Sequence, residues 1–271
     1  MNIDLHKEQQ QNPMRCLFLA FFCSLLLVVL HQTASSDDQF DSLFYGHYYE
    51  SVADRLYDSK EIPGNLLLAL EYYKKASNYL STNSEVEWKI GRCYWVLATK
   101  TVKEEDRLVY FKEGIRYGKL GVKNNPDSSN AHLWLSLIVG SSAMDQGVVR
   151  TLYNREMIKS GLETALRINP SNTNAYVGLA GWYFHVPKFL GGDREKAFQY
   201  INRAIRIEPD YTSARLVKAE FLLQENRHPE AIRTLKEILN IKKPAIRGDG
   251  VENVNNARKM LDQLKAEGFS G

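Results

Sequence analysis

Three residues with a shared spacing could hold an anionic ligand. Trp88, Arg92 and Trp95 lie four and three residues apart, which places them on one face of a helix. A guanidinium can bind a carboxylate through two parallel hydrogen bonds, while the indoles cover an apolar tail. In a competing, purely structural interpretation, Arg92 stacks on a tryptophan and pairs with Glu85.

Other residue types that commonly perform chemistry show no supporting pattern. The histidines lack the spacing of a metal-binding helix, and no serine, histidine and acid combination stands out. Gly191 and Gly192 are not followed by Gly-Lys-Ser, which argues against a phosphate-binding loop, and Asp193 instead fits a helix N-cap. We therefore expect no enzymatic activity, no metal and no cofactor.

Composition narrows the class of protein further. The chain has 271 residues, of which 44% are hydrophobic and 25% are charged, as in a folded soluble protein. The net charge is only +3 with acids and bases interspersed, so nothing favours nucleic acid as a partner. Cys93 is the one cysteine outside the N-terminal apolar segment, and its helical, apolar surroundings predict a buried thiol.

The elements that must position these residues are repeated helix pairs. The phrase Ala165-Leu-Arg-Ile-Asn-Pro170 returns as Ala204-Ile-Arg-Ile-Glu-Pro209, and a helical pattern follows each proline. The second helices carry Ala197, Ile201 and Ala204, then Ala231, Leu235 and Ile238, at i, i+4 and i+7, and the alanines among them let antiparallel helices approach closely. This is the tetratricopeptide pattern, with a unit of about 34 residues.

We therefore predict an all-α, tetratricopeptide-like solenoid of about five helix pairs with a C-terminal capping helix. The repeats are expected over residues 37–250, and the capping helix and tail over 251–271 after a Gly248-Asp249-Gly250 turn. The third repeat has surplus residues near 145–150, which either lengthen both of its helices or form a loop between them. Gly114, Gly118 and Gly121 replace the usual alanines, which indicates either very tight packing or local irregularity.

In tetratricopeptide pairs the first helix lines the concave face, at positions 2, 5, 9, 12 and 13 of the repeat. Peptide-clamping repeats usually place Lys, Arg and Asn there. In this chain the groove positions are mostly apolar, with two polar points, and the candidate ligand-binding residues are Trp88, Arg92, Trp95, Leu133, Leu137, Val177, Phe184, His185 and Leu216. Position 2 carries polar residues: Glu85, Asn130, Asn174 and Ser213.

Three interpretations of this apolar lining remain open. The enlarged repeats or the C-terminal helix could fill the concavity as ordinary core. A partly open apolar channel with a few polar groups would be a ligand site. A groove of the same composition could also receive a helix or loop of a partner protein.

The N-terminus has the anatomy of a leader. Residues 16–30 form an apolar run without a charge; Lys7 and Arg15 precede it, and Thr33-Ala34-Ser35 follows. Residues 1–36 are therefore interpreted as a signal peptide or a retained signal-anchor. On this interpretation the protein is exported to the periplasm, either free or anchored to the membrane through this segment.

The segment Pro187-Lys-Phe-Leu-Gly-Gly-Asp-Arg-Glu-Lys-Ala197, together with the leader and two enlarged repeats, resembles one family. This is the periplasmic T-protein associated with TRAP transporters (tripartite ATP-independent periplasmic transporters), with Leu190-Gly-Gly-Asp193 as its most specific mark over residues 120–264. The resemblance implies an accessory transport component that binds an apolar or carboxylate ligand, a solute-binding protein or another envelope protein, with a homo-oligomer left open. The microtubule-dynamics regulators of animals look similar over the same span, although the leader favours the T-proteins. The alternative function is a general tetratricopeptide interaction scaffold in the cell envelope.

Overall fold

The computed structural model describes residues 41–80 and 84–269, and all regular secondary structure within these ranges is helical. The chain divides into two units, residues 1–45 and 46–271. The helices from α2 onward all lie in the second unit. A first helix occupies residues 41–58. The later helices are α2 (Asn65–Tyr79), α3 (Ser84–Lys100), α4 (Glu104–Asn124), α5 (Ser129–Asp145), α6 (Val148–Ile168), α7 (Thr173–His185), the short 3-10 helix η1 (Lys188–Leu190), α8 (Arg194–Ile207), α9 (Thr212–Gln224), α10 (His228–Asn240) and α11 (Arg247–Ala266).

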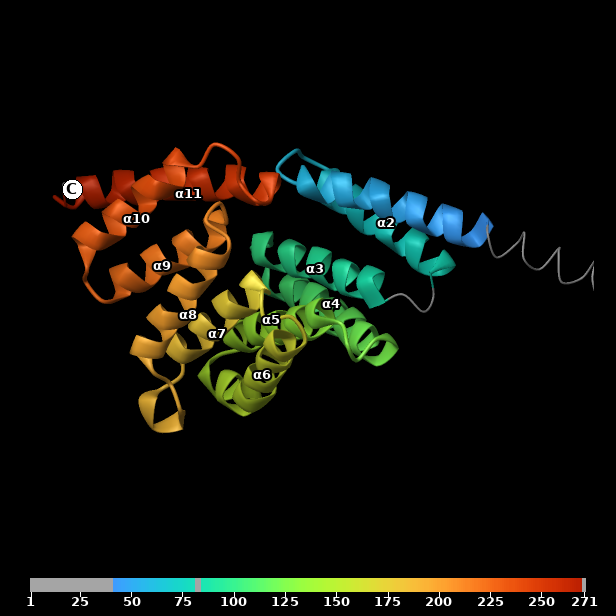
Figure 1. The fold of residues 1–271 in the computed structure, drawn as a ribbon, viewed down its shortest axis with the longest axis horizontal. Helices are drawn as coiled ribbons and strands as arrows, with labels where there is room; N and C mark the ends of the chain where they lie inside the picture. The colour runs from blue at the N-terminus through green and yellow to red at the C-terminus, as the bar shows by residue number, and fades with distance from the viewer. Residues whose placement is uncertain (1–40, 81–83, 270–271) are drawn as a thin grey trace, which may run out of the picture. The chain divides into compact units, whose positions relative to one another are not determined.

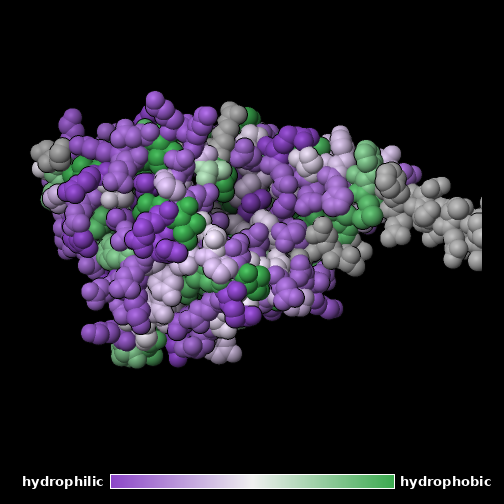
Figure 2. All heavy atoms as spheres, viewed as in Figure 1, coloured by the Kyte–Doolittle hydropathy of each residue, from purple (hydrophilic) through white to green (hydrophobic). Residues whose placement is uncertain are grey.

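Successive helices pack as pairs, which confirms the predicted tetratricopeptide-like solenoid with a final helix after the pairs (Figure 1). The most extensive helix contacts are α3 with α4, α5 with α6, α7 with α8 and α9 with α10. The small residues predicted to permit this approach, Ala197, Ala204 and Ala231, are fully buried. Polar and charged residues cover most of the face shown in Figure 2, because each helix turns only one stripe of side chains inward.

The glycines of α4 permit close packing against neighbouring helices, and they do not make α4 irregular. α4 is a continuous helix of 21 residues, and Gly114, Gly118 and Gly121 are all buried in it. A Cβ added at Gly114 would lie 3.3 Å from the carbonyl oxygen of Gly91 on α3. The two backbones therefore approach more closely than alanine would comfortably allow.

The surplus residues of the third repeat lengthen both helices. α5 ends at Asp145 and α6 begins at Val148, so only two residues separate them. Gly147 makes this reversal with a φ of 100°, a conformation that glycine adopts without steric cost.

The predicted Gly248-Asp249-Gly250 turn is wrong, because these residues form the first turn of α11. An acidic residue is favourable near a helix N-terminus, and Asp249 also pairs with Lys60 from the beginning of the solenoid. These interactions offset the low helix propensity of two glycines. The division at residue 250 stays a prediction, although α11 itself begins at Arg247.

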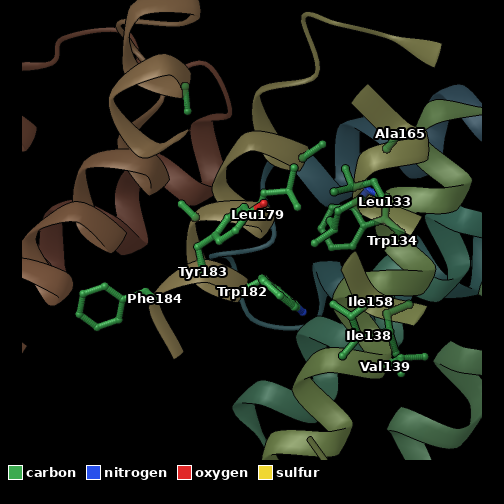
Figure 3. Packing of buried hydrophobic residues seen from close by; sticks show 14 of the residues in the cluster. Leu133, Trp134, Ile138, Val139, Ile158, Ala165, Leu179, Trp182, Tyr183 and Phe184 are labelled. Atoms are coloured by element: carbon green, nitrogen blue, oxygen red, sulfur yellow. The ribbon is translucent and has the colours of Figure 1, made fainter. Parts of the chain in front are cut away.

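A continuous core lies between the helices of the middle repeats (Figure 3). It joins Leu133 and Ile138 of α5, Ile158 of α6 and Leu179 of α7, all of them buried. Cys93 is fully buried, as predicted, in the neighbouring cluster between α2 and α3. The leader, residues 1–36, lies outside the described residues. Of the helices in the described part of the chain, none is long and apolar enough to cross a membrane.

Candidate functional site

A cavity of about 590 Å³ lies on the inner side of the solenoid. Its wall is formed by the first helices of four successive pairs, α3, α5, α7 and α9, together with α6 and the first turn of α11. A hollow is visible near the middle of the face in Figure 2. The concavity is therefore narrowed by α11 but is not filled as core.

Five of the nine predicted groove residues line this cavity: Arg92, Trp95, Leu137, Val177 and His185. Position 9 of each repeat faces it in every pair from the second to the fifth: Arg92, Leu137, Gly181 and Glu220.

The other four predicted residues, Trp88, Leu133, Phe184 and Leu216, do not line the cavity, because neighbouring helices cover them. The Trp88 ring lies parallel to that of Trp134 with centroids 6.3 Å apart, and Phe184 stacks on Phe221 at 4.0 Å.

Leu133 is fully buried, and Leu216 packs against the cluster that joins α9, α10 and α11. Trp88, Leu133 and Leu216 are at position 5 of their repeats, whereas Val177, at position 5 of the fourth pair, lines the cavity.

Several cavity residues escaped the sequence analysis because they lie outside the first helices of the second to fifth pairs. Lys60 and Tyr57 come from the end of the first helix and the turn after it. α6 contributes Thr151, Arg155, Ile158 and Leu162. These four have the i, i+4, i+7, i+11 spacing of one helical face, and Thr151 and Arg155 lie in the part of α6 that the surplus residues extend. The extra length was the signal that could have identified them.

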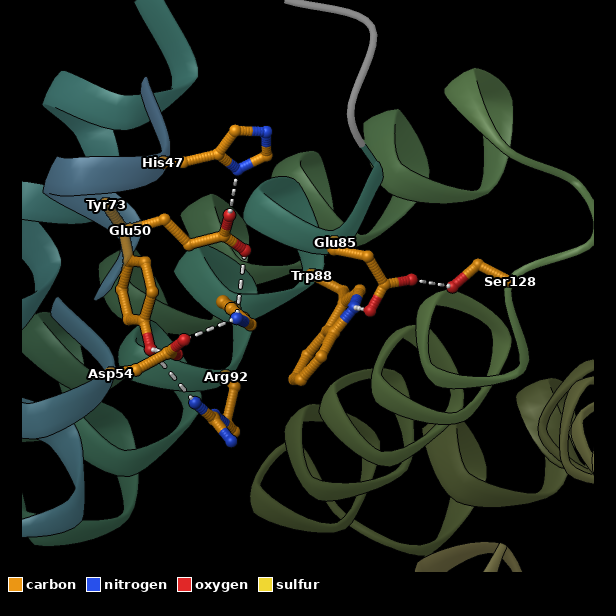
Figure 4. Close-up of polar contacts among 9 residues, drawn as sticks. His47, Glu50, Asp54, Tyr73, Glu85, Trp88, Arg92 and Ser128 are labelled. Carbon is orange, nitrogen blue, oxygen red and sulfur yellow. Dashed lines mark hydrogen bonds and ion pairs between the residues drawn. The ribbon is translucent and has the colours of Figure 1, made fainter. Parts of the chain in front are cut away.

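Arg92 is partly buried at the cavity wall and is surrounded by aromatic rings, of which Figure 4 shows Trp88. Its Cζ lies 3.6 Å from the Tyr57 ring centroid, 5.0 Å from Trp88 and 5.9 Å from Trp134. Such contacts stabilise a guanidinium electrostatically without satisfying its N–H donors.

The guanidinium of Arg92 makes one long hydrogen bond, from Nη2 to the Tyr73 hydroxyl at 3.3 Å. Its buried Nε has no hydrogen-bond acceptor, and no carboxylate of the described residues lies within ion-pairing distance. The predicted structural pairing with Glu85 is therefore absent. Glu85 instead accepts hydrogen bonds from Trp88 Nε1 at 2.7 Å and from Ser128 Oγ at 2.8 Å.

The nearest carboxylates act on Arg92 only indirectly. Tyr73 donates its hydroxyl hydrogen to Asp54 at 2.5 Å, and the other oxygen of Asp54 accepts from Lys89 at 2.9 Å. Lys89 also donates to Glu50 at 2.9 Å. Figure 4 shows this chain of contacts leading from the first helix to Arg92. The network orients Tyr73. The group that directly accepts a hydrogen bond from Arg92 is therefore the neutral hydroxyl of Tyr73 and not a carboxylate.

The polar position-2 residues connect successive repeats along the inner edge. Each bonds to a residue of the following repeat or of α11, as in Ser128 to Glu85, Asn172 to Asn130, Tyr211 to Asn174 and Asn253 to Ser213. Side chains that peptide-clamping repeats present to a peptide are here used within the protein.

His185, the second predicted polar point, lies at the cavity wall beside Arg194. Desolvation, followed by the nearby Arg194 cation, lowers the pKa of His185, so its imidazole is neutral at pH 7. It can therefore both donate and accept a hydrogen bond there. No group of His, Cys, Asp and Glu side chains in residues 41–80 and 84–269 is arranged to hold a metal ion.

Residues 50–189, just over half of the chain, match the family "Regulator of microtubule dynamics protein 1-3". The chain belongs to this family. Residues 189–247 match the tetratricopeptide repeat, in agreement with the predicted repeat type.

Members of the family from mammals show the extent of the similarity. Regulator of microtubule dynamics protein 1 of Bos taurus is 25% identical over 181 residues, covering 61% of this chain and 55% of the relative. Regulator of microtubule dynamics protein 3 of Rattus norvegicus is 21% identical over 99 residues, covering 36% and 21%. The chain thus spans about half the length, or less, of the curated relatives it matches.

The solved structure of a thermophilic tetratricopeptide protein from Thermus thermophilus is similar in fold, with a TM-score of 0.59. It is 20% identical, and the match covers 77% of this chain and 98% of that one. This likeness supports the helical-repeat fold alone.

Two predictions require correction. The matched family is that of the microtubule-dynamics regulators, the second resemblance noted in the sequence, and not that of the T-proteins of TRAP transporters. The predicted export to the periplasm is also wrong, because the matched relatives are proteins of cattle, mouse and other vertebrates, whose cells have no periplasm. The leader-like composition of residues 1–36 misled both inferences.

Proposed function

We propose that this chain is a non-enzymatic binding protein whose cavity takes a small ligand with a carboxylate head and an apolar body. Arg92 binds the head, and Trp95, Leu137 and Val177 contact the body. The observation that carries the proposal is the Arg92 guanidinium, which lies at the cavity wall without a carboxylate partner among the described residues.

The physical argument starts from the cost of leaving such a group unmatched. A desolvated guanidinium with an unused N–H donor is unfavourable, and a carboxylate that accepts two of its hydrogen bonds removes this cost. The cavity volume of about 590 Å³ lies within the range of small-molecule sites. Its position-2 side chains already bond within the protein, which favours a compact ligand over an extended peptide.

Calorimetric titration of the purified chain with decanoate tests the proposal, and decanol serves as the uncharged ligand of the same length. We expect Arg92→Met to weaken decanoate binding roughly ten- to a hundredfold, which corresponds to about 1.5–3 kcal/mol for a charged hydrogen bond. Decanol should bind the two proteins equally. Arg116→Met is the matched control, because Arg116 is exposed and pairs with Glu113 on α4.

Two results would contradict the proposal. One is the absence of decanoate binding to the unaltered protein. The other is equal decanoate affinity for Arg92→Met and the unaltered protein, which would make Arg92 a structural residue stacked on Tyr57.

The second candidate function is a scaffold that binds a protein partner, in a process connected with microtubule dynamics as the names of the relatives state. Family membership favours it, as does the exposed apolar start of α6, with Val148, Val149 and Tyr153 on its surface. Co-sedimentation with microtubules distinguishes the two candidates when Arg92→Met and a Val149→Asp, Tyr153→Asp double variant are compared. A scaffold that uses the start of α6 loses co-sedimentation only in the double variant.

A further inference from the structure

The first turn of α11 closes the solenoid back onto its beginning. Asp249 forms an ion pair with Lys60, although 189 residues separate them along the chain. The Lys60 side chain is buried. Gly248 makes this contact possible, because a Cβ at this position would lie 2.8 Å from the carbonyl oxygen of Asp58.

A second ion pair lies beside the first. Glu252, three residues after Asp249 and on the same face of α11, pairs with Lys100 at the end of α3. Lys100 and Glu252 are both partly exposed, with 45% and 32% of their side chains accessible. All four charged residues line the cavity, so the two ion pairs form part of its wall.

The rest of α11 is held differently. Asn253 donates hydrogen bonds to the hydroxyls of Thr212 and Ser213 on α9, both at 2.9 Å. Further along the helix, Ala257 and Leu264 are buried in a cluster with residues of α9 and α10. The body of α11 is therefore fixed to the last helix pair by apolar packing, whereas its first turn meets the start of the solenoid through ion pairs.

We propose that the start of α11, residues 247–252, is an electrostatic clasp, made by the pairs Lys60–Asp249 and Lys100–Glu252, that opens to admit a ligand to the cavity. This proposal extends the proposed function and depends on it, because the clasp admits a ligand only if the cavity is a ligand site. Salt screens the partly exposed Lys100–Glu252 pair, whereas the buried Lys60–Asp249 pair is screened much less and apolar packing is not weakened in this way. The first turn therefore opens more often at high salt, while the remainder of α11 stays in place.

Hydrogen–deuterium exchange of the purified chain measures this opening without any ligand. The amide of Gly250 is hydrogen-bonded to Ile246 in the first turn of α11, so its exchange reports local opening. We expect Glu252→Lys to increase exchange over residues 248–253 about fivefold, because it places two lysines together. The inverted pair, Lys100→Glu with Glu252→Lys, should restore slow exchange.

The control is Glu237→Lys on α10, which removes an ion pair with Arg215 at a position outside the cavity wall. It should leave exchange of residues 248–253 unchanged. Asp249→Asn tests the buried pair, with circular dichroism confirming that the protein remains folded. Raising sodium chloride from about 0.02 M to about 0.5 M should increase exchange in the unaltered protein and have less effect in Glu252→Lys.

The clasp is overturned if Glu252→Lys and the inverted pair exchange alike, or if neither variants nor salt affect residues 248–253. Decanoate is then added to the same proteins. Glu252→Lys leaves Arg92 itself unaltered. If decanoate associates faster with this variant than with the unaltered protein, the result supports the proposal that the clasp controls entry of the ligand into the cavity. If the inverted pair restores slow exchange but no protein binds decanoate, the clasp is supported and the carboxylate site is refuted. The two proposals can therefore be refuted independently of each other.

Discussion

Glu87 should make the stability of this protein depend on pH near neutrality. Its side chain lies between α3 and α2 and is only 1% exposed. One carboxyl oxygen accepts a long hydrogen bond from Ser77 at 3.4 Å, and the other has no hydrogen-bond partner among the described residues. Burial, only partly offset by hydrogen bonds, raises the pKa of Glu87 to about 7, from an ordinary value of 4.5.

The sign of the effect follows from proton binding. Between pH 4.5 and about 7 the folded protein holds a proton on Glu87 that the unfolded chain has released. The free energy of unfolding therefore falls as the pH rises through this window. A shift from 4.5 to about 7 corresponds to a total loss on the order of 3 kcal/mol, which is complete above the folded-state pKa.

The substitution Glu87→Gln removes this titration while keeping the shape of the side chain. We expect the variant to be about 3 kcal/mol more stable than the unaltered protein at pH 8.5, and similar to it at pH 4.5. Urea unfolding followed by circular dichroism at both values measures the difference. Glu71→Gln on α2 is the control, because Glu71 is exposed and pairs with Lys75.

A stability difference between Glu87→Gln and the unaltered protein that is the same at both pH values would refute this reasoning. It would mean that Glu87 is charged in the folded state throughout, and that packing or hydrogen bonding explains the effect of the substitution.

Two further predictions concern the repeats. Burial raises the pKa of the Cys93 thiol to about 12, so iodoacetamide at pH 8 should modify it only after unfolding in urea; mass spectrometry of its peptide shows native labelling if this is wrong. Asn172→Ala removes the N-cap of α7 and the hydrogen bonds to Ser129 and Asn130, at a cost of about 1–2 kcal/mol by urea unfolding. Asn154→Ala, at a partly exposed position of α6, should cost much less, and equal losses would contradict the role of Asn172 between repeats.

The sequence was sufficient for the repeat type and for the all-helical fold. Local signals determine these features: the prolines after each pair, the small residues that let helices approach, and the N-cap residues such as Asp193, which accepts the hydrogen bond from the Lys196 amide. The tetratricopeptide pattern predicts that position 9, together with positions 2, 5, 12 and 13, faces the concave side. Arg92 was consequently placed on the cavity wall before any tertiary contact was known.

The first turn of α11 and the surroundings of Arg92 could not be read from the sequence. Gly248 and Gly250 predict a turn, and only the long-range contact with residues 58–60 makes that segment helical and closes the cavity. Similarly, no local spacing in the sequence indicates that the Tyr57 ring stacks on Arg92 or that the Trp88 ring stacks on Trp134. Such contacts depend on the rotation of each repeat relative to the next. This rotation is set by many packing interactions along the whole solenoid, and the sequence of one segment does not determine it.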